Sequence, residues 1–543
     1  MHFKKSLVGL TLIASSLQGL ATTQANEYRF IVKYRQPVTA LKLSKQLNAP
    51  VKSLQPIAGG AYVIVIDAHA VKNSSEAELL TQLKQNLALV YAVKDRVGHF
   101  KPLPKVSMEE SFFPITHQLQ WDEFAAPGGV MLESAAGLRD GAWAYTTGHA
   151  SQPIVVAVLD TGIAEHPALK ANLLRDSNGE VLGWNFAANN RDLTDETKSF
   201  HGTHVAGTIA ALGDEMTGVG EDLKILPLKI PDASGMFYES QVVNAIYWAV
   251  GGKVPGLPVN PYPAKVLNMS FGVDKQPGEE IAYCDEALQS ALDFSRNRGA
   301  VAVVAAGNDN HWESYNAPAV CNGTIKVAST GPQGLRAYYS NYGPGVSFAA
   351  PGGDLRYGRT GGILSTVKPN GGYQGSGYDF YQGTSMASPH AAGVAALVYA
   401  ARDGRIKPLE VEQILYVTTH AFGESEDTDK SCVGKKPCGH GILDAESAVK
   451  TALANYDVIF SAPKINHLPA SCNTKQHILM AEKQSWLMQA ASCRQVSDYT
   501  SPVIKQSKNG EIIANYGKVS YVLNTTNYSH CDIIGVDGVG CNQ

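Results

Sequence analysis

The sequence predicts an α/β protein whose main domain is a doubly wound, mostly parallel sheet. Two observations predict this fold: near-continuous apolar runs of strand length, and stretches of helical spacing between them. The runs are residues 154–159, 224–228, 266–269 and 300–305, and the helical stretches are residues 204–212, 240–250 and 286–297. Such runs are typical of strands buried on both faces of a parallel sheet. In this architecture the functional site lies beyond the carboxyl ends of the strands.

A smaller α/β unit is predicted before this domain. Strands at 28–34, 61–66 and 90–97 alternate with helices at 41–47 and 76–89, and this order predicts a small α/β sandwich. Residues 101–105 contain two prolines, which predicts an exposed linker that proteases can nick.

The segment after about residue 455 has a different composition. Residues 456–543 contain four cysteines, many polar residues and short candidate strands such as 519–523. We expect a small β-rich C-terminal extension that contains disulfides, and its role is open.

The composition limits the class of protein. A chain of 543 residues suggests two to four domains, and 44% hydrophobic with 17% charged residues describes a soluble globular protein. The formal net charge of −4 and the lack of a basic run argue against a nucleic-acid partner.

The N-terminus predicts a secretory signal peptide over residues 1–25. Lys4 and Lys5 precede an apolar run at 7–21, and small and polar residues follow. A membrane anchor is the alternative, but the run is short for one, and no later segment has 18 consecutive apolar residues. We therefore expect a secreted protein with no membrane anchor in its mature form, with passage through the periplasm as one route.

Eight cysteines fit an oxidising compartment. None forms a CxxC pair or has zinc-finger spacing with histidine, so we expect structural disulfides. Cys432 and Cys438 are close enough in sequence to close a small loop, and Cys284 with Cys321 would bracket a longer one.

Ser385 stands between small residues just before an apolar helical pattern at 391–400. Unpaired backbone N–H groups and the positive end of the helix dipole gather at such a place, which suits a developing oxyanion. A serine there can act as a nucleophile. It can equally be an ordinary N-cap, and the segment 383–390 alone does not separate the two.

Asp160 follows an apolar run and precedes Thr161-Gly162. Aspartic proteases also use Asp-Thr-Gly, but their chemistry needs a second such carboxylate, which this sequence lacks. A structural turn aspartate is the other alternative.

His201 and His204 begin a helical pattern. The two histidines could bind a metal, supply a general base or form an ordinary surface pair, and the motif alone leaves these alternatives open. The glutamate of an HExxH motif is absent. Asp160 could hold the tautomer of His201 while the imidazole takes a proton from Ser385. Asn308 follows another apolar run, and its amide can donate to an oxyanion or simply stabilise a turn.

Together these motifs resemble the subtilisin-like serine proteases, whose triad runs Asp, His, Ser along the chain. The matching segments are VVAVLDTGI at 155–163, HGTHVAGT at 201–208, AAGN at 305–308 and GTSMASPH at 383–390. This order excludes the chymotrypsin-like and α/β-hydrolase families. The resemblance covers about residues 28–450.

The resemblance implies a secreted serine endopeptidase that acts on proteins and peptides as a monomer and needs no cofactor for its chemistry. Asp160 would orient His201, which would act as general base and acid, and Ser385 would form the acyl-enzyme. Asn308 and the Ser385 N–H would hold the oxyanion, and His204 would be structural.

The resemblance also implies a substrate cleft whose edge segment pairs with an extended peptide. The residues expected to form the edge and the pocket before the scissile bond are Ser270, Phe271, Gly272, Ala305, Ala306 and Gly307. Gly272 and residues 305–307 would form the walls of this pocket, and their small side chains imply a roomy apolar pocket and broad specificity. No acidic residue is obvious there.

Four segments follow from the resemblance: a signal peptide at 1–25, a propeptide at 26–109, a peptidase domain at 110–455 and an extension at 456–543. The propeptide would act as chaperone and inhibitor, with its C-terminal tail in the cleft, and its removal would be autoproteolytic. The pairs Cys284–Cys321 and Cys432–Cys438 resemble disulfides of secreted bacterial members.

A structural calcium ion is also implied, with Asp176, Asp192 and Asp195 as candidate ligands in an acidic loop. A solvated acidic loop is the alternative. Two other functions stay open: a catalytically silent relative that only binds, and an enzyme restricted to one partner or to its own chain.

Overall fold

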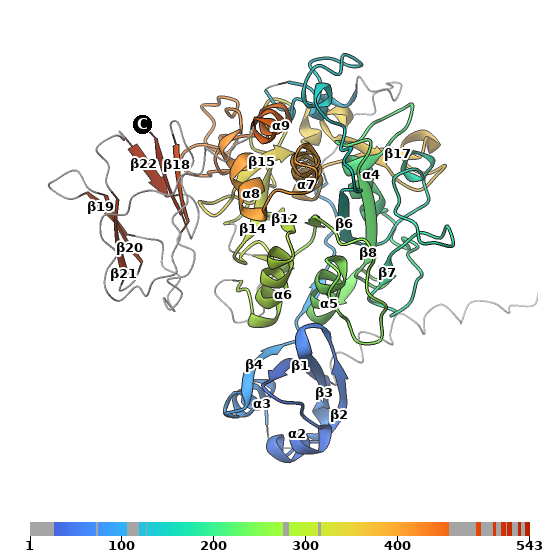
Figure 1. Cartoon of the computed structure of the whole chain (residues 1–543), viewed down its shortest axis with the longest axis vertical. Coiled ribbons are helices and arrows are strands. Elements are labelled where there is room, and N and C mark those ends of the chain that lie inside the picture. The colour runs from blue at the N-terminus through green and yellow to red at the C-terminus, as the bar shows by residue number, and fades with distance from the viewer. Residues whose placement is uncertain are drawn as a thin grey trace, which may run out of the picture.

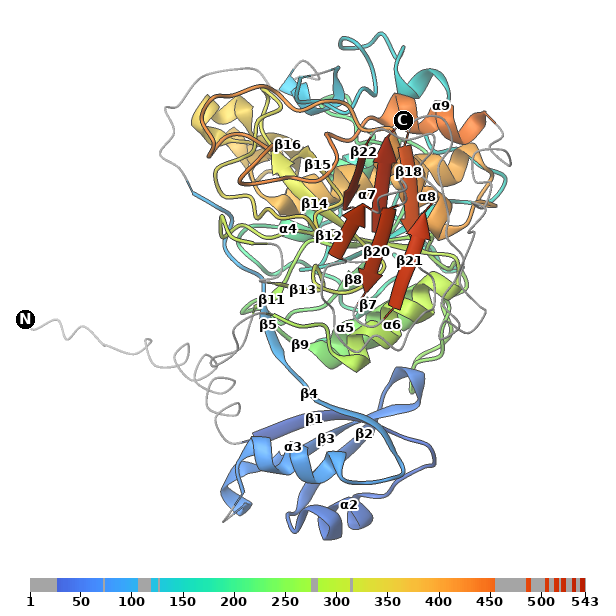
Figure 2. The same cartoon turned by 90° about the vertical axis from the view of Figure 1, so that its left-hand side faces the viewer.

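The computed structural model describes residues 27–71, 74–105, 119–125, 127–274, 282–312 and 316–454, and six strands between residues 485 and 542. The predicted signal peptide and residues 106–118 lie outside the described residues. A small N-terminal unit, coloured blue, lies against a larger body that spans residues 119–454, as Figure 1 and Figure 2 show from two sides.

A four-stranded antiparallel sheet in the order β2-β3-β1-β4 forms the N-terminal unit. Its elements are β1 (Glu27–Tyr34), α2 (Ala40–Leu47), β2 (Val51–Pro56), β3 (Ala61–Asp67), α3 (Glu76–Lys84) and β4 (Leu89–Lys94). Because side chains alternate along a strand, Phe30 and Val32 face the two helices, whereas Ile31 between them packs against the body. The sheet is therefore buried on both faces.

Two predictions for this unit were wrong. The helix predicted over 76–89 ends at Lys84, because the Asn86 side chain accepts the N–H of Ala88 in a turn that competes with the helix (2.9 Å). The strand predicted over 90–97 divides into β4 and a short β5 (Val97–His99). The sequence also does not predict β2, which carries no apolar run.

Seven parallel strands form the sheet of the body, in the order β15-β14-β12-β10-β6-β8-β7, which confirms the predicted doubly wound fold. They are β6 (Val155–Asp160), β7 (Trp184–Asn185), β8 (Lys224–Lys229), β10 (Val266–Met269), β12 (Val301–Ala305), β14 (Thr324–Thr330) and β15 (Phe348–Pro351). Helices cover both faces (Figure 1). One face carries α4 (His201–Ala210), α7 (Thr384–Ala401), α8 (Pro408–Val417) and α9 (Ala445–Leu453), and the other carries α5 (Glu239–Ala249) and α6 (Glu286–Asn297).

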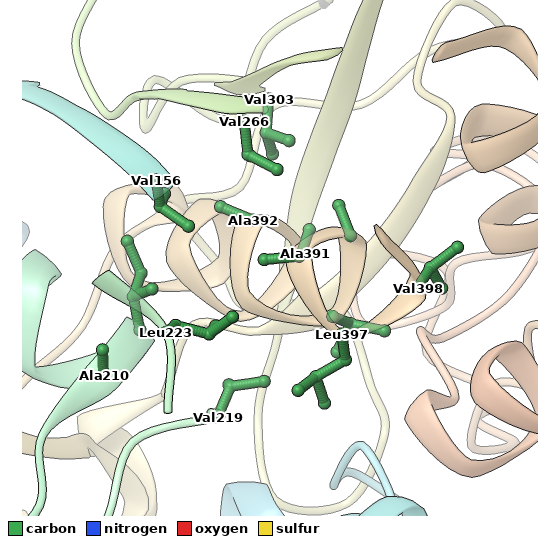
Figure 3. Packing of buried hydrophobic residues seen from close by; sticks show 14 of the residues in the cluster. Val156, Ala210, Val219, Leu223, Val266, Val303, Ala391, Ala392, Leu397 and Val398 are labelled. Atoms are coloured by element: carbon green, nitrogen blue, oxygen red, sulfur yellow. The ribbon is translucent and has the colours of Figure 1, made fainter. Parts of the chain in front are cut away.

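Helix α7 lies in the interior of the body, and every residue of its first seventeen is buried. Figure 3 shows Ala391 and Ala392 packed near Val156, Val266 and Val303, which come from three neighbouring strands. The small side chains of α7 let the helix approach the sheet closely. This packing fixes where the helix begins, and its first turn carries Ser385.

The C-terminal extension contains two three-stranded antiparallel sheets, which confirms its β-rich character. Their strands are β18 (Ser485–Gln489), β19 (Val503–Gln506), β20 (Ile512–Tyr516), β21 (Val519–Leu523), β22 (His530–Ile533) and β23 (Gly538–Asn542). Strand β21 coincides with the predicted strand at 519–523. The disulfides predicted for this extension fall on side chains outside those that the structure describes.

Two disulfides join Cys284 to Cys321 and Cys432 to Cys438, and both pairs confirm the sequence prediction. Within the described part of the chain, no helix combines the length and the apolar character that crossing a membrane requires.

Candidate active site

The four predicted chemical residues lie at the carboxyl edge of the parallel sheet. Asp160 is the last residue of β6, and Asn308 follows the end of β12, two strands away in the sheet order. His201 begins α4 and Ser385 is the second residue of α7. His201, Asn308 and Ser385 line one cleft. The fold thus brings together residues that are far apart in the sequence.

His201 and Asp160 form a buried pair. The imidazole donates from Nδ1 to Oδ1 of Asp160 at 2.7 Å, and Asp160 also accepts the N–H of Thr161 (2.8 Å). Burial disfavours a charged imidazole, but the carboxylates of Asp160 and Asp195 outweigh it and raise the pKa of His201. This hydrogen bond leaves Nε2 as the acceptor of the neutral ring.

His204 has a different environment from His201. Its Nε2 lies 3.1 Å from the carbonyl of Ile363 and 3.2 Å from that of Asp379, and its ring stacks on Tyr381. Burial lowers the pKa of His204 to about 3, so the ring is neutral and donates to these carbonyls. His204 ties α4 to the neighbouring β-hairpin of β16 (Ile363–Thr366) and β17 (Tyr378–Tyr381).

Ser385 is held by the segment that follows β10. Its hydroxyl donates to the carbonyl of Ser270 (3.0 Å), and the hydroxyl of Ser270 donates to the carbonyl of Ser385 (3.1 Å). Ser388, one turn along α7, donates to Asn268, whose amide donates to Ser270. The start of α7 is therefore fixed to the end of β10, and the Ser385 N–H stands in the first turn of a helix.

Asn308 presents its amide N–H groups toward the cleft because its carbonyl oxygen is already engaged. Asn308 Oδ1 accepts both the N–H and the hydroxyl of Thr384, each at 2.8 Å. The preceding Gly307 has a φ of +105°, and a Cβ there would lie 2.2 Å from the Asn316 amide nitrogen. Only glycine fits this approach, which turns the chain so that Asn308 faces Ser385.

Five of the six predicted cleft residues line the cleft. They are Ser270, Phe271, Gly272, Ala305 and Gly307. Ala306 does not line it: this side chain is fully buried on the other side of the segment, against the disulfide of Cys432 and Cys438. Successive residues of an extended segment point in opposite directions, which explains the difference.

The end of the N-terminal unit runs through the cleft as an added strand. Strand β5 pairs antiparallel with β9 (Met236–Tyr238), and His99 forms a bridge with Gly272. Phe100 then donates its N–H to the carbonyl of Gly235 (2.8 Å) and places its ring 5.8 Å from that of His201. The last residues of the N-terminal unit therefore lie in the cleft beside His201.

Residues 101–105 cross the cleft, and were predicted as an exposed linker. Lys101, Pro102 and Lys105 are exposed, as expected, whereas Leu103 packs against the core of the body. Lys101 forms an ion pair with Asp309 (2.9 Å). The sequence prediction of a pocket without an acidic residue was therefore wrong, although Asp309 directly follows the recognisable AAGN motif.

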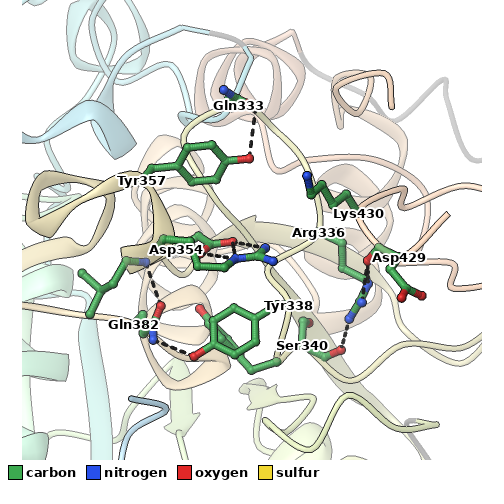
Figure 4. A network of polar contacts seen from close by, with 12 residues as sticks. Gln333, Arg336, Tyr338, Ser340, Asp354, Tyr357, Gln382, Asp429 and Lys430 are labelled. Carbon is green, nitrogen blue, oxygen red and sulfur yellow. Dashed lines mark hydrogen bonds and ion pairs between the residues drawn. The ribbon is translucent and has the colours of Figure 1, made fainter. Parts of the chain in front are cut away.

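A polar network that includes Gln382 and Tyr338 (Figure 4) also hydrogen-bonds the carbonyls at the end of the crossing segment. Gln382 donates from Nε2 to the carbonyl of Pro104 (2.9 Å) and to the hydroxyl of Tyr338, which donates to the carbonyl of Lys105 (3.3 Å). The Leu355 N–H donates to Gln382 Oε1 and so fixes the orientation of the amide. No motif in the sequence signals Gln382 or Tyr338.

The three carboxylates predicted as calcium ligands have separate partners and do not form one site. Asp176 pairs with Arg191 (2.7 Å), Asp192 caps its own turn, and Asp195 is buried and accepts from two threonine hydroxyls. Across the described residues, no group of three or more His, Cys, Asp or Glu side chains is placed to hold a metal ion. These side chains do not fit the expected site.

Comparison with known proteins is consistent with this geometry. The family profile described as "Subtilase family" matches residues 151–441. The chain is 33% identical over 476 residues to an extracellular protease of Xanthomonas campestris pv. campestris, covering 80% of this chain and 75% of the relative. It is 30% identical over 497 residues to an extracellular basic protease of Dichelobacter nodosus, covering 83% and 75%.

Two solved structures are also similar. A protease from Pseudoalteromonas arctica PAMC 21717 is 35% identical with a TM-score of 0.51, covering 62% of this chain and 100% of that one. Fervidolysin from Fervidobacterium pennivorans, described as a keratinolytic enzyme related to subtilisin, is 23% identical with a TM-score of 0.55. That match covers 91% of this chain and 69% of the other, and supports the fold.

Proposed function

The chain belongs to the subtilase family, and we propose that Ser385, His201 and Asp160 form its catalytic triad. It is a serine endopeptidase, and like the extracellular relatives above it acts outside the cell. The observation that carries the triad is the buried 2.7 Å contact of His201 with Asp160, beside a cleft that Ser385 also lines.

Acylation begins with attack of Ser385 Oγ on the carbonyl carbon of the scissile bond. The hydroxyl leaves the Ser270 carbonyl and turns to His201, whose Nε2 takes its proton. Asp160 keeps the proton on Nδ1 and stabilises the imidazolium. His201 then gives its proton to the leaving amine, the C–N bond breaks, and Ser385 carries the acyl group as an ester.

Deacylation uses the same residues with water as nucleophile. His201 takes a proton from the water, which attacks the ester, and Ser385 regains its proton as the acid product leaves. In both steps the Asn308 amide and the Ser385 N–H would donate to the tetrahedral oxyanion. These donors are held in place before the reaction, by Thr384 and by α7, so they need little reorganisation.

Residues 26–109 would act as a propeptide that occupies the cleft. Cleavage of the chain by the enzyme itself would then separate this propeptide from the peptidase domain at 110–455. The support is that β5 fills the strand position expected for a peptide substrate, between β9 and Gly272. The mature enzyme would cleave proteins and peptides with varied side chains before the scissile bond.

The test is to compare Ser385→Ala with the control variant Ser295→Ala, which alters a buried serine in α6 whose hydroxyl donates to Leu292 within the same helix. We expect Ser385→Ala to accumulate the precursor, to resist labelling by a fluorophosphonate and to lose about 10⁶-fold in turnover, because it removes the nucleophile. Ser295→Ala should still mature and take the label. Processing, labelling and casein hydrolysis are the measurements.

Normal maturation of Ser385→Ala expressed alone would contradict self-processing. Labelling of the mature enzyme without cleavage of casein would instead favour an enzyme restricted to one partner. Because the base must be neutral and its pKa is raised, kcat/KM should increase as the pH rises through that pKa.

A further inference from the structure

A buried arginine joins the N-terminal unit to the body some distance from Ser385. Arg96 donates from Nε and Nη2 to the two carboxylate oxygens of Glu239, both at 2.7 Å. Its Nη2 also lies 3.4 Å from Oδ2 of Asp285, and its Nη1 donates to the carbonyl of Tyr283 (2.9 Å). The side chains of Arg96 and Glu239 are each 1% exposed.

This contact is shaped for a guanidinium group rather than for any positive charge. The planar fork of arginine matches the two oxygens of Glu239, while its outer edge reaches Asp285 and Tyr283 and its face lies 4.6 Å from the Tyr283 ring. A lysine ammonium is a point charge and cannot make this set of bonds.

The body itself holds the acceptors in place. Glu239 is the first residue of α5, and its backbone N–H also donates to the carbonyl of Arg96 (2.9 Å). Asp285 is the N-cap of α6, where Oδ1 accepts two backbone N–H groups. Its Oδ2 is buried and accepts no hydrogen bond, and Nη2 of Arg96 lies 3.4 Å from it. These acceptors therefore belong to the body and would remain when the N-terminal unit leaves.

A cation between the two carboxylates relieves the repulsion of their charges. Burial and the neighbouring Asp285 raise the pKa of Glu239 well above its usual value, which shows how costly the paired negative charges are at this place. Arg96 supplies the compensating charge while the N-terminal unit is attached.

The chain runs from this site directly into the catalytic cleft. Arg96 is followed by β5, in which Gly98 lies so close to Phe237 that a Cβ would come within 2.2 Å of the ring. Phe100 then contacts His201. A peptide that follows the same strand therefore brings the residue four positions before its Phe100 equivalent to Glu239.

We propose that Glu239, Asp285 and the Tyr283 carbonyl form a subsite that binds an arginine of extended protein substrates, several residues before the scissile bond. The proposal rests on the proposed function, because it assumes that substrates follow the path of β5. It names arginine-containing segments as a preferred class of substrate.

The test uses the mature enzyme secreted from the full chain and two peptide series. One is acetyl-Arg-Val-Gly-His-Phe-Lys and the other is acetyl-Arg-Val-Gly-His-Phe, each ending in a fluorogenic amide. The cleaved bond follows the lysine in the first and the phenylalanine in the second, so the two series cover both alignments of the peptide with the cleft. In one of them we expect kcat/KM to be about 30-fold higher than for the same peptide with Gln or Lys in place of Arg. This readout needs no variant and is independent of its folding.

Two variants then assign the effect to the site. Glu239→Gln should remove most of the preference for arginine over glutamine. The matched control is Glu286→Gln, which removes an exposed charge next to Asp285 and should keep the preference.

Equal rates for the Arg, Gln and Lys peptides in both series would overturn the subsite. So would an enzyme that takes the fluorophosphonate and hydrolyses casein but cleaves none of the peptides. An enzyme that neither labels nor hydrolyses casein would contradict the proposed function instead, so the two failures are distinguishable.

Discussion

The interior of the body around α7 is apolar, whereas its contact with the N-terminal unit combines apolar and charged side chains. Around α7, the packing consists of alanine, valine and leucine from the helix and from three strands (Figure 3). At the contact, apolar residues of the sheet such as Ile31 pack against the body, and charged groups meet beside them. Asp95 accepts from Arg29 and caps α5 through Ser240, and Arg96 pairs with Glu239.

The two kinds of contact differ in how easily they can separate. Apolar contacts in the body can be lost only by exposing the core to water, which costs about 25 cal/mol for each Å² of apolar surface. Charged groups recover their hydration when two surfaces separate, so an ion pair stabilises a contact much less than its Coulomb energy suggests. The charged part of the contact with the N-terminal unit can therefore be firm and still be released.

The largest expected effect is in the interior. Leu397→Ala in α7 removes a fully buried side chain, and the cavity should lower the free energy of unfolding by about 2–5 kcal/mol. The measurement is urea unfolding of the full chain carrying Ser385→Ala. Leu87→Ala is the control, since Leu87 is 93% exposed and should change stability little. Equal losses of stability for the two substitutions would contradict this expectation.

A smaller effect is expected at the contact. Arg96→Ala leaves Glu239 without its partner, and should lower the free energy of opening of the contact by about 2 kcal/mol. Hydrogen exchange of the Phe100 amide, which is bonded to Gly235, should then be roughly 30-fold faster in the Ser385→Ala chain. Exchange within β6 should stay as it was.

The matched control for Arg96→Ala is Lys52→Ala, which removes an exposed cation from an ion pair with Glu27 elsewhere in the same unit. Its Phe100 amide should exchange as in the parent. Faster exchange throughout β6 in the Arg96 variant would mean that the contact stabilises the body itself, and would contradict a role confined to the contact.

The smallest effect concerns the exposed edge of the contact. Asp309 and Lys101 are each about one-third exposed, so Asp309→Asn should lower kcat/KM for lysine before the scissile bond, relative to leucine, by about threefold. Asp403→Asn, at the other end of α7, is the control. A tenfold or larger loss of this preference would show that Asp309 is as buried in the substrate complex as the Arg96 site is.

The main parts of the fold and of the site could be predicted because their signals are local. Buried strands appear as apolar runs, and parallel strands place their carboxyl ends at one edge, so Asp160 and Asn308 were expected near the helix that carries Ser385. His204 resembles His201 in sequence, and only the resemblance to a family distinguished their roles.

The rest depends on contacts between residues that are far apart in the chain. Arg96 and Glu239 are 143 positions apart, and each alone has the pattern of an ordinary surface charge. Gln382 and Tyr338 hydrogen-bond the crossing segment, yet neither stands in a motif. Such pairs become visible only when the fold has placed them together.

Helix α7 is the central packing element of the body and also carries Ser385. This double role determines how the enzyme loses its activity. A molecule whose α7 loosens has no working nucleophile, and intact enzyme molecules can cleave its opened chain. Inactivation in a dense solution should therefore follow the number of encounters between molecules, so that dilution prolongs the working life of the enzyme and crowding shortens it.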